Sequence, residues 1–263
     1  MPGGRQARMG HCTKPHRVTT ILCDRLMTIK LNADKQLLEK IDEFERLGGC
    51  VQFKVFDVEN PNNSYQTHLA IAKQTLIEIS KDSDNYFQKI AKELNTDREQ
   101  YFKQSIDFSK LENSGTQIQL SDFLGPQFDT QTRKPFIKGV QRLYNSYFYY
   151  DTEEIEKNSV NLNEIAGQYK FNDSDGVTGA FCGAFLEPPH SVRIGTSIFE
   201  HGRYFLEFSN LFFSDLNNIE IYKWSVDCSN YFDAGKEWWG SHFWTIYNPI
   251  KNIYIGIVAS TTD

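Results

Sequence analysis

The sequence predicts an α+β fold, with a helix-rich N-terminal half and small sheet followed by a mostly antiparallel C-terminal sheet with a helix. Residues 64–112 contain neither glycine nor proline and repeat apolar side chains at helical spacing. The last hundred residues instead alternate short apolar runs with turn residues, as antiparallel strands do. With 263 residues, of which 40% are hydrophobic, the chain is long enough to bury a sizeable core.

Charge sets the first 26 residues apart from the rest. They carry five basic side chains against Asp24, whereas the whole chain has a net charge of −6. The apolar stretch VTTILC in this segment is shorter than a secretion signal requires. We expect residues 1–26 to be a disordered extension, residues 27–125 a helix-rich region and residues 136–263 an α+β region, with the last two free to form one domain.

The first predicted elements are a helix and a strand. Asn32 is expected to cap the helix, and Gly48 with Gly49 to end it, since glycine adopts the left-handed conformation of a helix C-terminus. Residues 51–58 alternate apolar and polar side chains and are expected to form a strand.

Helices are expected throughout residues 64–112. The apolar stripe continues through Tyr86 and Leu94, and the polar run 82–84 is expected to break the helix. Thr96 and Glu99 form a capping-box pattern that predicts another helix, running through residue 106.

The C-terminal half is expected to contain strands at 116–124, 179–186 and 219–226 and a helix at 199–213. Residues 242–248 and 253–260 are expected to pair as a hairpin across Pro249. Residues 140–150 could form a helix or a strand, because consecutive aromatic residues give no period.

All four tryptophans fall within a 21-residue run near the C-terminus. Large amphipathic rings beside ionisable groups suit a binding surface, although they suit the core of a sheet equally well. The rigid pair Pro188–Pro189 directly precedes His190, which is a further candidate for contact with a partner. The candidate binding residues are Trp224, Tyr231, Phe232, Trp238, Trp239, Trp244 and His190.

The same run contains candidate catalytic residues. Carboxylates and an imidazole could supply acid and base groups or hold a divalent metal. Their spacing matches neither an HExxH pair nor a calcium loop, so we expect no bound metal and no cofactor. The candidates are Asp227, Asp233, Glu237 and His242.

Composition also limits the partners and the setting. An acidic body argues against a general nucleic-acid binder and favours a cationic partner. No apolar run approaches the roughly 20 residues of a membrane span. The five cysteines are widely spaced and lack a CxxC pair, which is typical of free thiols in a reducing cytoplasm.

Residues 176–263 resemble the C-terminal region of a family of uncharacterised bacterial proteins. The resemblance depends on the runs YKWS, SNYFDAG, EWWG and FWTIY and on the terminal STTD. The family has no assigned activity and thus no catalytic residues to carry over. It is associated with toxin–immunity neighbourhoods, which implies a binding role.

Two functions follow as expectations. The first is a soluble, cytoplasmic protein that binds another protein, for which a basic partner is expected, as an immunity-type inhibitor of a bacterial toxin does. The alternative is a hydrolase or metal-dependent enzyme that uses the Asp/Glu/His cluster of residues 227–242. Convergence of those four side chains on one cavity would favour the enzyme.

Overall fold

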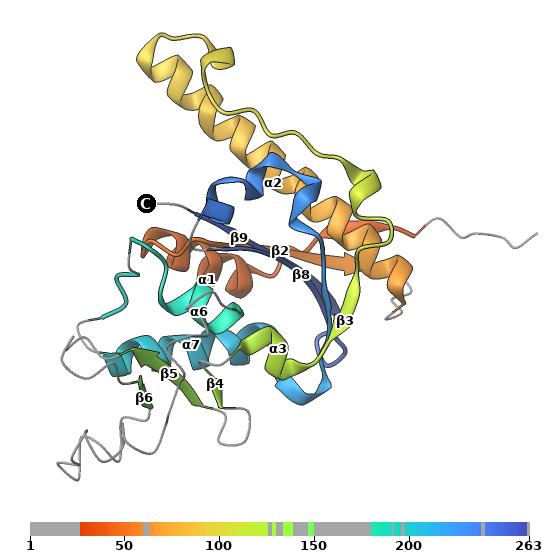
Figure 1. Cartoon of the computed structure of the whole chain (residues 1–263), viewed down its shortest axis with the longest axis vertical. Helices are drawn as coiled ribbons and strands as arrows, with labels where there is room; N and C mark the ends of the chain where they lie inside the picture. The colour runs from red at the N-terminus through yellow and green to blue at the C-terminus, as the bar shows by residue number, and fades with distance from the viewer. Residues whose placement is uncertain are drawn as a thin grey trace, which may run out of the picture.

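A six-stranded antiparallel sheet with strand order β1-β2-β9-β8-β7-β3 forms the centre of the molecule (Figure 1). The computed structural model describes residues 27–59, 64–125, 128–129, 134–138, 147–149, 180–190, 192–195, 198–237 and 240–261. The strands of the sheet are β1 (Ile29–Leu31), β2 (Val51–Val58), β3 (Thr116–Ile118), β7 (Glu220–Lys223), β8 (Ser241–Asn248) and β9 (Ile253–Ser260). A second sheet contains β4 (Phe128–Asp129), β5 (Lys134–Lys138) and β6 (Tyr147–Tyr149).

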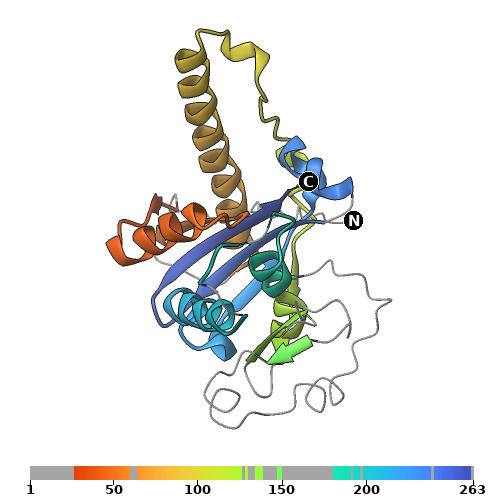
Figure 2. The ribbon, with the colours of Figure 1, turned by 90° about the vertical axis from the view of Figure 1, so that its left-hand side faces the viewer.

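Helices cover both faces of the six-stranded sheet (Figures 1 and 2). Helix α2 (Tyr65–Leu94) packs on the face that carries Phe243 and Val258. The opposite face carries Trp244 and Ile255 and packs against other helices of the described residues. These are α1 (Lys35–Arg46), α3 (Leu120–Leu124), α6 (Phe181–Leu186) and α7 (Ile198–Phe213). The α+β prediction is confirmed, and β2 of the N-terminal half pairs with β9 of the C-terminal half.

Helix α1 has a different cap from the predicted one. Asp34 accepts hydrogen bonds from the backbone N–H groups of Gln36 and Leu37, at 2.9 and 3.3 Å. Asn32 lies two residues earlier, where its own N–H donates to the carbonyl of Val55 across the sheet. The predicted stop is confirmed, because Gly48 adopts a φ of 92°.

Helix α2 is continuous over 30 residues, so the predicted break at residues 82–84 is wrong. Two of the polar side chains are bound by cations from elsewhere: Lys54 contacts Asp82, and Arg98 Nη2 lies 2.5 Å from Asp84 Oδ1. A polar run that contains neither glycine nor proline lowers helix propensity only slightly, and tertiary contacts outweigh this small cost. The helix ends at Asn95 in the left-handed conformation.

The predicted helix from Thr96 to residue 106 is also wrong. A short 3₁₀ turn spans Arg98–Gln100, and Asp97 caps it by accepting from the N–H of Glu99. The Thr96 hydroxyl lies 2.7 Å from the Tyr101 hydroxyl, while Tyr101 itself is extended. The capping-box pattern therefore begins a turn that leads into an extended return segment.

The predicted strand at residues 179–186 is the short helix α6, all six residues of which are buried. A continuous apolar run has no period, so a buried helix and a buried strand have the same sequence pattern. The predicted strand at 116–124 divides into β3 and α3, and the one at 219–226 ends at Lys223.

The periodic predictions hold. β2 covers the predicted residues 51–58, α7 covers 199–213, and β8 and β9 form the predicted hairpin. Asn248 shapes its turn by accepting hydrogen bonds from the N–H groups of Ile250 and Lys251. Of residues 140–150, the described part 147–149 forms a strand. The predicted extension at 1–26 lies outside the described residues.

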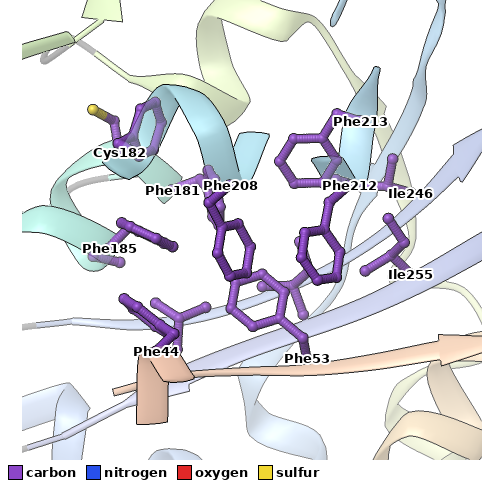
Figure 3. Packing of buried hydrophobic residues seen from close by; sticks show 14 of the residues in the cluster. Phe44, Phe53, Phe181, Cys182, Phe185, Phe208, Phe212, Phe213, Ile246 and Ile255 are labelled. Carbon is purple, nitrogen blue, oxygen red and sulfur yellow. The ribbon is translucent and has the colours of Figure 1, made fainter. Parts of the chain in front are cut away.

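Phenylalanines dominate the core between the sheet and α1, α6 and α7 (Figure 3). Phe44 stacks on Phe185 with ring centroids 4.1 Å apart, and Phe208 stacks on Phe212 at 4.3 Å. Edge-to-face and stacked rings of this kind contribute beyond the area they bury. Trp244 joins this core by meeting the ring of Phe123 edge-on at 5.4 Å.

On the other face, α2 packs closely on β9 at Gly256. A Cβ atom at this position would overlap the side chain of Thr75, whose hydroxyl donates to the carbonyl of Ile71 at 2.7 Å. Glycine is therefore required by the close packing of the helix on the strand.

We predict that Gly256→Ala lowers the free energy of unfolding by about 1–3 kcal/mol, the usual cost of overpacking. Thr75→Ala in the same chain removes two of the overlapping atoms and should recover part of that loss. Urea denaturation of wild type, both single variants and the double variant measures the coupling. Additive losses would contradict the proposed overlap.

Candidate functional site

Three of the candidate binding aromatics belong to the core, which is the alternative that the sequence left open. Trp224 and Trp244 are each 2% exposed, and Phe232 is fully buried. Trp224 packs against Tyr65 and Tyr222, with its ring directly over Gly115. Rings in these positions stabilise the sheet and its helices and are not accessible to a partner.

The other predicted binding residues have different positions. Tyr231 is half-buried and lines a cavity described below. His190 is exposed in the turn after α6. Trp238 and Trp239 lie outside the described residues.

A buried polar network links Trp224 to α2. Its indole Nε1 donates to the Thr245 hydroxyl at 2.9 Å, and the same hydroxyl lies 2.8 Å from Nδ1 of His68. Within the described part of the chain, Nε2 of His68 has no hydrogen-bond partner. Burial lowers the pKa of His68 to about 3, so the imidazole is neutral at physiological pH.

This histidine predicts a specific dependence of stability on pH. The unfolded chain has a histidine pKa of about 6.5, so it takes up the proton before the folded chain does. The contribution of His68 is therefore complete above pH about 6.5 and is lost as the pH falls toward 3. We expect His68→Gln to reduce the fall in unfolding free energy between about pH 7 and about pH 5.

Urea denaturation at the two pH values measures this slope. His190→Gln, which removes a histidine from an exposed turn that is not part of this network, is the matched control for the loss of one histidine. An unchanged slope in His68→Gln would show that other groups cause the dependence.

A polar cavity of about 680 Å³ lies between the return segment after α2 and the 3₁₀ turns that follow β7. The turns Val226–Cys228 and Asn230–Phe232 are capped by Ser225 and Ser229, whose hydroxyls accept backbone hydrogen bonds. The cavity is lined mostly by hydroxyl, amide and charged groups: Ser105, Ile106, Asp107, Lys110, Ser114, Ser225, Asp227, Cys228, Ser229, Asn230, Asp233 and Lys236.

Lys236 neutralises two of the predicted catalytic carboxylates in this cavity. Its Nζ lies 2.8 Å from Asp227 Oδ1 and 3.2 Å from Asp233 Oδ1. The hydrogen bond from Lys236 lowers the pKa of Asp227, and the Asp227 carboxylate in turn raises the pKa of Lys236. Asp227 and Lys236 are therefore both charged at neutral pH, so the Asp227 carboxylate is not poised to take or give a proton.

Cys228 lines the cavity, but its thiol is not set up to act as a nucleophile. The side chain is buried, and burial raises the pKa of its thiol to about 11. Its Sγ lies 3.2 Å from the carbonyl oxygen of Ser225. A protonated, buried thiol is unreactive.

Glu237 and His242 do not line this cavity. His242 lies on β8, two residues before Trp244, and stacks on that ring with centroids 4.9 Å apart. It therefore belongs to the α7 face of the sheet, whereas Cys228 packs with Phe243 on the α2 face. Among the residues described, no group of three or more His, Cys, Asp or Glu could hold a metal ion. The four candidate residues thus do not converge on this cavity.

A second cavity, of about 500 Å³, separates α2 from the body of the molecule; we call it the arm cleft. We call residues 80–106 the arm: they comprise the second half of α2 and the return segment that follows it. Figure 2 shows that α2 extends well away from the sheet. The cleft contains aromatic, aliphatic and acidic side chains: Glu45, Gly49, Cys50, Gln52, Ile79, Asp82, Ser83, Tyr86, Phe102 and Tyr231.

Two aromatic rings at the arm cleft are open to solvent. Tyr86 is 61% exposed and Phe102 is 42% exposed, and Leu94 near the end of the arm is also exposed. Both Tyr86 and Leu94 belong to the predicted apolar stripe of α2, but they lie in the second half of the helix, where few residues are buried. Exposed apolar side chains gathered at one cavity are typical of interaction sites.

The arm holds these rings in place. Phe87 stacks on Tyr101 at 5.7 Å, and Arg98 lies over the Phe87 ring. The return segment is fastened to the loop after β7, since Asn230 accepts from the N–H of Ser105 and donates to the carbonyl of Lys103. The walls of the cleft are therefore preorganised.

No helix of the described residues is long and apolar enough to span a membrane. No protein-family model, no curated protein and no solved structure matches the chain. The resemblance of residues 176–263 to a bacterial family stays a prediction.

Proposed function

We propose that this chain is a protein-binding protein that docks its partner in the arm cleft. One observation carries the proposal: Tyr86 and Phe102 are largely exposed beside a cavity whose walls are fixed by hydrogen bonds and stacked rings. Tyrosine and other large rings in preorganised pockets contribute most of the binding energy in protein interfaces.

Charge supports a basic partner. Glu45 and Asp82 line the same cleft, and the chain carries a net charge of −6. Carboxylates around an apolar pocket select for cationic segments and speed their association. The resemblance of the C-terminal region extends the proposal to an immunity-type inhibitor of a bacterial toxin. A cytoplasmic setting belongs to the same proposal, in which Cys50, Cys182 and Cys228 are free thiols.

A photo-crosslinking amino acid at position 102 tests the docking site. The matched control carries the same group at Leu38, an exposed apolar position on α1 that does not line the cleft. We expect a specific protein adduct from position 102 and none from position 38. Equal adducts from both positions, or an adduct only with a second copy of the chain, would count against the proposal.

With the captured partner purified, Tyr86→Ala and Phe102→Ala should each weaken binding by about 2 kcal/mol, or roughly 30-fold. Leu38→Ala should leave the dissociation constant within about twofold of wild type. Titration calorimetry measures the constants, and urea denaturation establishes that the variants are folded. Wild-type affinity in both cleft variants would overturn the assignment of this surface.

A further inference from the structure

The arm cleft contains a carboxylate that no described cation neutralises directly. Among the described residues, the side chain of Glu45 has neither a hydrogen-bond nor an ion-pair partner. The charge of Lys54 acts on Glu45 and partly offsets the rise in its pKa, but the Lys54 ammonium is bound to Asp82. Partial desolvation, with the nearby carboxylates Asp42 and Asp82, raises the pKa of Glu45. A positive charge in the cleft would relieve this repulsion.

The same cleft offers aromatic faces beside that carboxylate. Tyr86 and Phe102 are exposed at it, and Ile79 supplies an aliphatic wall. A cation over an aromatic ring is attracted to the negative face of the ring. The described part of the chain already contains such contacts, with Lys40 over Tyr204 and Arg98 over Phe87.

We infer that the arm cleft binds an arginine side chain of the partner, with the guanidinium against Tyr86 and Phe102 and its N–H groups donating to Glu45. This inference rests on the proposed function. Arginine fits better than lysine because its planar guanidinium is weakly hydrated, stacks on aromatic rings and donates in a fork that matches a carboxylate. Lysine presents a compact, strongly hydrated charge that loses more solvation in an apolar cleft.

NMR titration with N-acetyl-arginine-amide tests the inference without the partner. N-acetyl-citrulline-amide is the control compound, because it keeps the shape and lacks the charge, and N-acetyl-lysine-amide tests the preference for a guanidinium. We expect saturable shifts at residues 45, 79, 86 and 102 with the arginine compound. The lysine compound should bind more weakly, and the citrulline compound should cause no saturable shift.

Glu45→Gln should weaken the binding of the arginine compound by about fivefold or more, since the substitution removes the charge and keeps the side-chain length. Glu39→Gln is the matched control on α1, because Glu39 is exposed, pairs with Lys35 and does not line the cleft. It should bind as wild type does, and the dispersion of both spectra reports folding. Equal shifts with citrulline, or equal affinity in Glu45→Gln, would overturn the inference.

The two proposals fail separately. Suppose that Tyr86→Ala and Phe102→Ala weaken the binding of the partner, while Glu45→Gln changes the binding of neither the partner nor the arginine compound. The docking proposal then stands and the arginine inference is wrong. If arginine binds in a Glu45-dependent manner while Tyr86→Ala and Phe102→Ala keep full partner affinity, the cleft is an arginine site and the docking proposal is wrong.

Discussion

The contact between α2 and β9 at Gly256 determines how the rest of the molecule is arranged. Without a side chain at this position, the helix lies close enough for Thr75 to sit directly over the strand. The first half of α2 is then buried from Thr67 to Ile79, and its apolar residues are matched by Phe243 and Val258. A helix of 30 residues is about 45 Å long, more than this contact occupies, so its second half extends beyond the sheet.

This projection of α2 creates the arm cleft, and it also places apolar side chains of the helix beyond the cover of the sheet. A bare helix of this length would leave Phe87 without cover, and the return segment covers this ring with Tyr101 and the Arg98 side chain. The backbone of Asp107 then donates to the carbonyl of Cys228 at 2.7 Å, and Ile106 forms a β-bridge with Ser229. The loop after β7 thus fixes the base of the arm, and the polar cavity and the arm cleft both use its residues as walls.

The sequence predicts a helix or strand correctly where its apolar residues repeat at a fixed period. It fails where tertiary contacts select the conformation of a segment. Alternation in residues 51–58 and 253–260 identifies β2 and β9, and the stripe in 199–213 identifies α7. The run at 181–186 is apolar throughout, so only packing among phenylalanines selects a helix. The concentration of tryptophans indicated an important segment, but burial of Trp224 and Trp244 depends on partners over a hundred residues away, such as Gly115 and Phe123.

The candidate site was beyond prediction for the same reason. Glu45, Tyr86, Phe102 and Tyr231 come from four separate segments that meet only after α2 is placed on the sheet. Of the predicted catalytic group, sequence proximity brought Asp227 and Asp233 together through Lys236, while strand alternation placed His242 on the other face.

The two cavities differ in what a ligand must displace, and this difference favours the arm cleft as the binding site. In the polar cavity, Asp227 and Asp233 already share the Lys236 ammonium, so an incoming cation gains only the difference between two similar ion pairs. In the arm cleft, Glu45 lacks such a partner among the described residues, and the exposed rings of Tyr86 and Phe102 gain burial as soon as they are covered. Because the cleft walls are fixed before the partner arrives, little of that gain is lost in ordering them.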